Sequence, residues 1–146
     1  YQINQYNEVN IMGTSNILQS ISTLGKKCAI RKIILSSSRS VYGEGKYNCS
    51  LCGIVYPLRR DKEHMMAGDF SMYCPKCGNR LQLVPTNEDS EIHPSSLYAF
   101  TKYSQEKMFE TMCPAMGFDY TIFRFQNVYG VGQSLKNPYT GILSIF

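Results

Sequence analysis

Apolar side chains recur every three or four positions over the first 24 residues, and this spacing predicts a helix. The members of the stripe are Ile3, Tyr6, Val9, Met12 or Gly13, Ile17, Ile21 and Leu24. Gly25 is expected to end the helix, because glycine readily adopts the left-handed conformation found at helix C-termini. An apolar run over residues 31–35 then leads directly into Ser36, Ser37 and Ser38. Its continuous Ile-Ile-Leu predicts a strand of a parallel sheet that is buried on both faces.

The order of helix and strand returns after residue 90. Ser95 or Ser96 can cap a helix that passes through Leu97, Phe100, Met108 and Met112 and is expected to stop at Pro114 and Gly117. Residues 119–125 are interpreted as the next strand, and residues 127–130 as a loop at its C-terminal end. Helices and strands that alternate with short connections predict an α/β fold with a parallel sheet.

The middle of the chain, residues 46–89, has a different character. It lacks sustained periodicity, its six basic and five acidic side chains nearly cancel, and it contains four cysteines as two Cys-x-x-Cys pairs. We therefore expect residues 1–45 and 90–146 to form one domain, into which residues 46–89 are inserted as a smaller subdomain.

The four paired cysteines, Cys49, Cys52, Cys74 and Cys77, indicate a metal site. The pairs are separated by 21 residues, and Gly53 and Gly78 allow a tight turn in which backbone N–H groups can face the sulfurs. Four thiolates suit tetrahedral zinc and leave no open position, so the ion would be structural. Disulfides or a redox pair are the alternatives. Tight pairs without a visible secretion signal favour metal in a reducing compartment, and we expect a cytoplasmic protein.

Length and composition exclude several classes of protein. The 146 residues, 43% hydrophobic and 18% charged, describe one folded chain, and a net charge of +4 does not require a nucleic-acid partner. No stretch of about 18 apolar residues exists, which argues against a membrane span. The chain begins with Tyr1, and its last residues, 141–146, read as an element cut short. We therefore expect an internal fragment of a longer protein.

Tyr98 and Lys102 are four residues apart on the expected second helix, so both project from one face. An ammonium beside a phenol favours the phenolate and lowers its pKa from about 10 toward the range of a general acid/base. Ser38 adds a hydroxyl at the end of the preceding strand, where open α/β sheets place their ligands. The three residues together predict a proton-transfer site.

Three ordered motifs resemble the extended short-chain dehydrogenases, and within them the nucleotide-sugar epimerase/dehydratase group. They are residues 36–43 (Ser-Ser-Ser-Arg-Ser-Val-Tyr-Gly), 94–102 (Pro-Ser-Ser-Leu-Tyr-Ala-Phe-Thr-Lys) and 124–130 (Arg-Phe-Gln-Asn-Val-Tyr-Gly). Residues 10–16 are similar to the family's Asn-x-x-Gly-Thr segment, so the resemblance covers everything except the insert. It implies a partial Rossmann-like, doubly wound parallel sheet, here carrying an inserted four-cysteine zinc ribbon.

The resemblance also implies roles for individual residues. Tyr98 would be the catalytic base, with Lys102 on the nicotinamide ribose of NAD. Ser38 would hold the reacting hydroxyl of a nucleotide-diphosphate sugar, with Ser40 as a second contact and Asn127 at the diphosphate. Ser36 and Asn10 would lie near the cofactor. In such enzymes the sugar C4 hydroxyl loses a proton as hydride passes to NAD+, and the keto-sugar turns and takes hydride back on its other face.

The reaction type depends on the residues after Ser38. Dehydratases of the family commonly carry Asp-Glu there, whereas this chain has Arg39 and Ser40, which favours an epimerase. A related dehydratase or reductase and a non-catalytic zinc-ribbon module that binds nucleic acid are the alternatives, and the nearly neutral insert argues against the last. The insert and residues 132–141 are similar to a branch resembling dTDP-L-rhamnose 4-epimerases. There the insert would serve as a lid or an oligomer contact.

The family's Gly-x-x-Gly-x-x-Gly cofactor segment does not occur in the chain. We therefore expect the 146 residues alone to bind NAD poorly and to be inactive, and the full-length protein, about twice as long, to be a homodimer.

Overall fold

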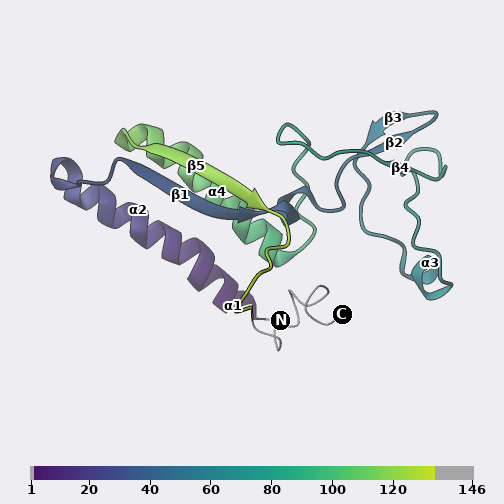
Figure 1. Ribbon diagram of the computed structural model, residues 1–146, viewed down its shortest axis with the longest axis horizontal. Helices are drawn as coiled ribbons and strands as arrows, with labels where there is room; N and C mark the ends of the chain where they lie inside the picture. The colour runs from purple at the N-terminus through teal and green to yellow at the C-terminus, as the bar shows by residue number, and fades with distance from the viewer. Residues whose placement is uncertain (1, 134–146) are drawn as a thin grey trace.

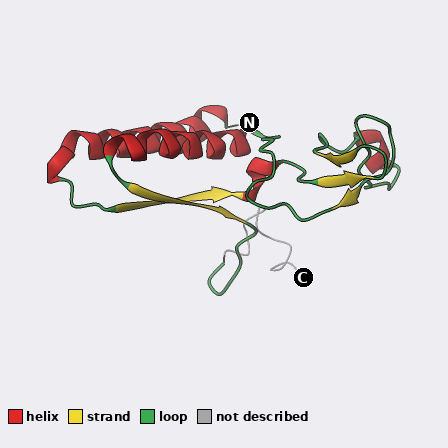
Figure 2. Ribbon diagram, turned by 90° about the horizontal axis from the view of Figure 1, so that it is seen from above, coloured by secondary structure: helices red, strands yellow, loops and turns green. Residues whose placement is uncertain are grey.

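The computed structural model describes residues 2–133. Two parallel strands, β1 (Lys32–Ser38) and β5 (Asp119–Phe125), pair in register from Lys32 opposite Asp119 to Ser38 opposite Phe125. The N-terminal helices and α4 (Leu97–Met116) cover one face of this pair (Figure 2). The predicted α/β class with a parallel sheet is confirmed, and β5 has the predicted bounds. The arrangement fits a piece of a Rossmann-like fold.

The N-terminal helix forms as predicted, but its buried face differs from the predicted stripe. It consists of α1 (Ile3–Tyr6), a π-helical segment η1 (Asn7–Met12) and α2 (Gly13–Leu24), and ends at Gly25 with φ +51°. The π turns hold extra residues and so rotate the face that follows them. The buried side chains of α2 are Thr14, Leu18 and Ile21, whereas most of the apolar stripe is exposed.

β1 differs from its prediction in length and in burial. It includes the three serines, and only one of its faces is covered in the described part of the chain. Leu35 and Ser37 are buried on the helix side, but Ile34 is 61% exposed on the other side. The prediction of burial on both faces is therefore wrong for the residues described, because the strand alternates its side chains and helices cover only one face.

α4 begins at the predicted cap, since Ser96 Oγ accepts a hydrogen bond from the backbone N–H of Ala99 at 3.1 Å. Gly117 ends it in the left-handed conformation. Pro114 lies inside the last turn and does not stop the helix, contrary to the prediction. The core between α4 and the strands contains Leu18, Leu35, Phe109 and Cys113.

Residues 46–89 form a separate small sheet at one end of the molecule (Figure 1). β2 (Tyr47–Cys49) pairs with both β3 (Gly53–Val55) and β4 (Gln82–Leu83), and α3 (Lys62–Met66) lies between β3 and β4 in sequence. This unit has its own buried cluster of side chains: Tyr47, Cys49, Val55, Met72, Cys74 and Leu81. The division into an outer domain and an insert remains a prediction that this arrangement supports.

The two stems of the insert run together where they leave the larger unit. The backbone N–H of His93 donates to Val41 O at 2.8 Å. Gly43 has φ +60°, and a Cβ there would meet the His93 carbonyl oxygen at 2.4 Å, so the crossing requires glycine.

No helix in the described range combines the length and apolarity needed to cross a membrane. Residues 141–146 and most of segment 132–141, on which part of the sequence interpretation rested, lie outside the described residues.

Candidate active site and cysteine cluster

The carboxyl ends of β1 and β5 form one edge of the sheet, and several candidate residues gather there. Ser38 is the last residue of β1, and its Oγ accepts a hydrogen bond from the Ser40 backbone N–H at 3.2 Å. That bond caps the short 3-10 helix η3 (Arg39–Tyr42). Asn127 is exposed two residues beyond Phe125, which pairs with Ser38. The strand pairing therefore places Ser38 and the Asn127 loop on the same edge, as the sequence predicts.

Tyr98 and Lys102 approach this edge from the first two turns of α4. Lys102 Nζ donates to the Ser36 carbonyl oxygen at 3.0 Å and lies 5.9 Å from the Tyr98 ring centroid. Burial lowers the pKa of the Lys102 ammonium from its ordinary value of 10.5. The Tyr98 ring is 37% exposed and packs edge-on against Tyr6. Tyr98 and Lys102 thus lie near the end of β1 that carries the serines. No hydrogen bond joins the Tyr98 and Ser38 hydroxyls in the described structure.

The other predicted contacts occupy different positions. Asn10 Nδ2 donates to Thr101 Oγ1 at 3.0 Å, so this side chain joins the N-terminal helix to α4 beside Lys102. The Ser36 side chain is exposed, and its carbonyl is the group that meets Lys102. Ser40 Oγ is buried and has no hydrogen-bond partner among residues 2–133. A buried hydroxyl without a partner is rare in folded proteins, and a ligand would reach this one only if the side chains around it moved.

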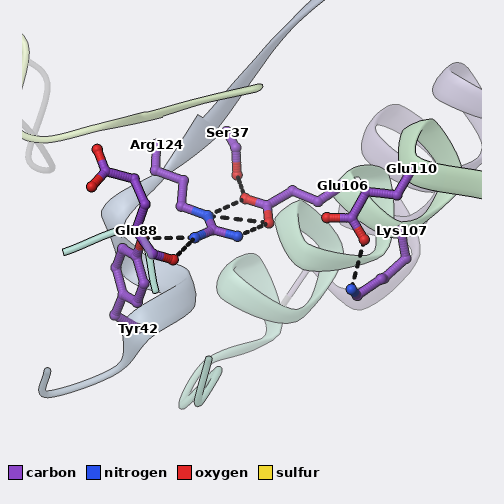
Figure 3. Close-up of polar contacts among 7 residues, drawn as sticks. All are labelled: Ser37, Tyr42, Glu88, Glu106, Lys107, Glu110 and Arg124. Atoms are coloured by element: carbon purple, nitrogen blue, oxygen red, sulfur yellow. Dashed lines mark hydrogen bonds and ion pairs between the residues drawn. The ribbon is translucent and has the colours of Figure 1, made fainter. Parts of the chain in front are cut away.

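A buried ionic network next to this edge escaped the sequence interpretation. Glu106 on α4 is fully buried and pairs with Arg124 of β5, and Ser37 Oγ donates to the same carboxylate at 2.5 Å (Figure 3). The sequence offers one sign of this network: Glu106 lies four residues after Lys102 and therefore on the same side of the helix.

The four paired cysteines lie together in the insert, and their Sγ atoms are all within 4.8 Å of one another. Cys49 Sγ and Cys77 Sγ are 3.5 Å apart. Gly53 and Gly78 have φ of +71° and +76°, the tight turns that the sequence predicts after each pair. His64 is not part of the cluster, and no disulfide joins the cysteines of the described chain.

The backbone around Cys74 favours a thiolate. Burial raises the pKa of the Cys74 thiol, but the backbone N–H groups of Lys76 and Cys77, together with the side chains of Cys77 and Cys49, outweigh it and lower the pKa to about 7. The Cys77 side chain is the largest cause that raises the pKa of Cys52, to about 12. Thiols this close cannot all ionise without a cation among them.

A family profile described as "NAD dependent epimerase/dehydratase family" matches residues 71–146, half of the chain, including Tyr98, Lys102 and Asn127. The chain belongs to this family. The family resemblance inferred from the three motifs is therefore confirmed, and with it an enzyme family that acts with NAD.

Two curated members of the family align with the chain. A dTDP-L-rhamnose 4-epimerase from Burkholderia thailandensis is 37% identical over 139 residues, which is 94% of this chain and 36% of that protein. The alignment takes in nearly the whole chain and so includes most of the insert. A protein named "Putative UDP-glucose 4-epimerase" from Methanocaldococcus jannaschii is 36% identical over 63 residues, 43% of this chain and 20% of that protein. The chain thus spans about a third or less of the length of these relatives. No solved structure matches it.

Proposed function

We propose that this chain is an internal segment of an NAD-dependent nucleotide-sugar epimerase that acts at the sugar C4, with Tyr98 as the acid/base. The observation that carries the proposal is the bond from Lys102 Nζ to the Ser36 carbonyl, which joins the Tyr98 helix to the strand that ends in Ser38. The 37% identity to a dTDP-L-rhamnose 4-epimerase over 94% of the chain supports this reaction type.

Each residue at the edge has a part in the proton transfer. The Tyr98 phenolate oxygen takes the proton of the sugar C4 hydroxyl and becomes a hydroxyl, Ser38 Oγ holds the C4 oxygen, and Ser40 Oγ offers a second contact. Asn127 binds the diphosphate. When bound, NAD supplies the acceptor and the donor of hydride.

The residues at the edge fit a nicotinamide ribose. An ammonium has three N–H donors, and Lys102 uses one of them on Ser36, which leaves two for ribose hydroxyls. Asn10 uses one of the two N–H donors of Nδ2 on Thr101, so the second N–H and the side-chain carbonyl oxygen remain for the cofactor. Ser36, near the carboxyl end of β1, would be a further contact to the cofactor.

The residues after Ser38 favour epimerisation over elimination. Arg39 bonds the Gly43 carbonyl oxygen at 3.2 Å, and the Ser40 backbone N–H is held by Ser38. Neither side chain is an acid that could protonate a leaving hydroxyl. A dehydratase or reductase of the same family is the second candidate function, and only the family match supports it.

The experiment is a C4 epimerisation assay of the full-length enzyme with NAD and a panel of nucleotide-sugars, followed by proton NMR. Tyr98→Phe should lower kcat by about 100- to 10,000-fold, the usual contribution of a general acid/base. The matched control is Tyr120→Phe, which removes the same hydroxyl near the amino end of β5, away from the site. Equal activity of the two variants, or products that have lost water, would refute the proposal.

The cysteine cluster is proposed to hold one structural zinc through Cys49, Cys52, Cys74 and Cys77. Tetrahedral zinc with Zn–S bonds of about 2.3 Å places its sulfurs about 3.8 Å apart, and all four Sγ atoms here lie within 4.8 Å. Cysteines stay reduced in a reducing compartment, so we also propose a cytoplasmic location.

The full-length protein is proposed to be a homodimer. The side chains of Val9, Met12 and Ile17 on the N-terminal helices are apolar and exposed, and they offer a surface for a second copy.

The insert is proposed to act as a lid or as an oligomer contact in this homodimer. Deleting residues 46–89 from the full-length enzyme should change substrate affinity or the number of chains per particle measured by light scattering. A deletion variant with unchanged affinity and the same number of chains per particle would refute this role.

The 146 residues alone are proposed to bind NAD poorly, because the glycine-rich pyrophosphate segment is not among them. Calorimetric titration of the purified chain with NAD tests this, and micromolar affinity would overturn it.

A further inference from the structure

Arg124 on β5 contacts three other parts of the chain at once (Figure 3). Its Nε lies 3.1 and 3.2 Å from the two carboxylate oxygens of Glu106, and its Nη2 lies 2.8 Å from Oε2. Its Nη1 donates to the Tyr42 hydroxyl at 2.7 Å and to the Glu88 carbonyl oxygen at 3.2 Å. One guanidinium therefore joins β5, α4 and the two ends of the insert.

The Glu106 side of this contact fixes α4 to the functional end of β1. Glu106 is fully buried, and its Oε1 also accepts from Ser37 Oγ. One turn earlier, Lys102 donates to the carbonyl of Ser36. Two successive turns of α4 thus hold two successive residues of the strand that ends in Ser38. A buried carboxylate is tolerated here because a guanidinium and a hydroxyl satisfy it.

The other side of the contact fixes the stems of the insert. Tyr42 lies four residues before the start of the insert and is buried, and Arg124 Cζ lies over its ring, 5.0 Å from the ring centroid. Glu88 lies at the return of the chain from the insert. The stems also bond each other where His93 N–H meets Val41 O. The chain therefore contacts Arg124 both where it enters the insert and where it returns from it.

We propose that Arg124 is a positioning residue that holds Tyr98 and Lys102 against Ser38 by joining α4 to both stems of the insert. This inference rests on the proposed epimerase function, since it assigns Arg124 a role in that site. Lysine cannot replace it, because an ammonium lacks the planar fork that binds Glu106 through two nitrogens while a third reaches Tyr42 and Glu88. An arginine at this place is therefore required by geometry as well as by charge.

The first test compares Arg124→Lys with Arg31→Lys in the full-length enzyme. Arg31 is exposed just before β1, at the opposite edge of the sheet. Arg124→Lys should lower kcat by about 10- to 100-fold, the cost of misplacing catalytic groups by about 1 Å, with KM for the sugar within about threefold. Arg31→Lys should leave both unchanged. A kcat for Arg124→Lys within about threefold of wild type would overturn the proposal.

A double variant separates positioning from stability. Replacing a buried ion pair by apolar residues of similar size is often neutral for folding, so Arg124→Met combined with Glu106→Leu should keep a melting temperature near that of wild type. It still lacks the bonds to Tyr42 and Glu88, and its kcat should stay at least about 10-fold low. Recovery of wild-type kcat in the double variant would show that the pair serves only the fold, which would overturn the proposal.

Amide hydrogen exchange measures how firmly Arg124 holds α4 and the stems of the insert, without an activity assay. Arg124→Lys should speed exchange over residues 97–103 and 84–93, and leave residues 110–116 unchanged. Unchanged exchange over 97–103 would contradict the positioning role. A wild-type enzyme with no epimerase activity would instead contradict the proposed function, and the exchange result would still decide the role of Arg124.

Discussion

Removal of the proposed zinc should unfold the insert and leave the parallel strands in place. The buried cluster of the insert has four side chains besides its cysteines: Tyr47, Val55, Met72 and Leu81. At about 1.5–3 kcal/mol for each buried apolar side chain, they contribute about 6–12 kcal/mol together. Structural zinc contributes about 10–16 kcal/mol at neutral pH. The ion is thus expected to stabilise the insert at least as much as its apolar core does.

The assay combines metal analysis with amide hydrogen exchange in the full-length enzyme. Wild type should contain one zinc per chain, and Cys74→Ser should lose it. Cys28→Ser is the matched control, because Cys28 is also buried but lies outside the cluster. In Cys74→Ser, protection should disappear for the Leu81 N–H bond to Met72 O, while β1 and β5 stay protected. A wild-type enzyme that binds no zinc under reducing conditions, or a Cys74→Ser variant that keeps zinc and protection, would refute the reasoning.

Three further predictions concern stability and are measured by denaturant titration. Glu106→Gln should lower the free energy of unfolding by about 1.5–3 kcal/mol, because it removes the charged partner of the Arg124 guanidinium, whose side chain is 18% exposed and so keeps some solvation. Glu110→Gln, in an exposed pair with Lys107, should cost less than about 1 kcal/mol, and equal losses would contradict the burial argument. Gly43→Ala should lower the free energy of unfolding by about 2–4 kcal/mol, because of backbone strain and the clash with the His93 carbonyl oxygen. The control Gly68→Ala, whose Cβ meets nothing within 4 Å, should lower it by about 1 kcal/mol. No loss of stability in Gly43→Ala would show that the stems can separate. Because burial lowers the pKa of Lys102 below 10.5, the unfolded chain binds more protons than the folded chain in the window between the two pKa values. Stability should therefore rise with pH across that window in wild type, and Lys102→Met should lose this contribution; identical pH profiles would contradict it.

The features that the sequence predicts well are those set by neighbouring residues. The strand Asp119–Phe125, the Ser96 cap and the helix end at Gly25 each depend on a short pattern, and the structure has all three. The gathering of Ser38 and Asn127 at one edge follows from parallel pairing alone. Local periodicity and the topology of parallel sheets are enough for these results.

The features that the sequence does not predict depend on distant contacts. The π-helical segment Asn7–Met12 rotates the helix face, and nothing in the apolar spacing indicates it. Pro114 has no N–H to donate to the carbonyl four residues earlier, so α4 loses one hydrogen bond there, yet the helix continues to Met116 and ends at Gly117. Glu106 and Arg124 are 18 residues apart and look like ordinary surface charges until the strand and the helix pack together. A single sequence does not say which charges become buried partners.

The most direct test of the account is a crystal structure of the full-length enzyme with NAD and its nucleotide-sugar. If Tyr98 and Ser38 serve the proton transfer, their hydroxyl oxygens both lie within about 3.2 Å of the same C4 oxygen of the sugar. A sugar whose C4 hydroxyl contacts neither residue, or that binds on the opposite face of the sheet from α4, would contradict the epimerase assignment.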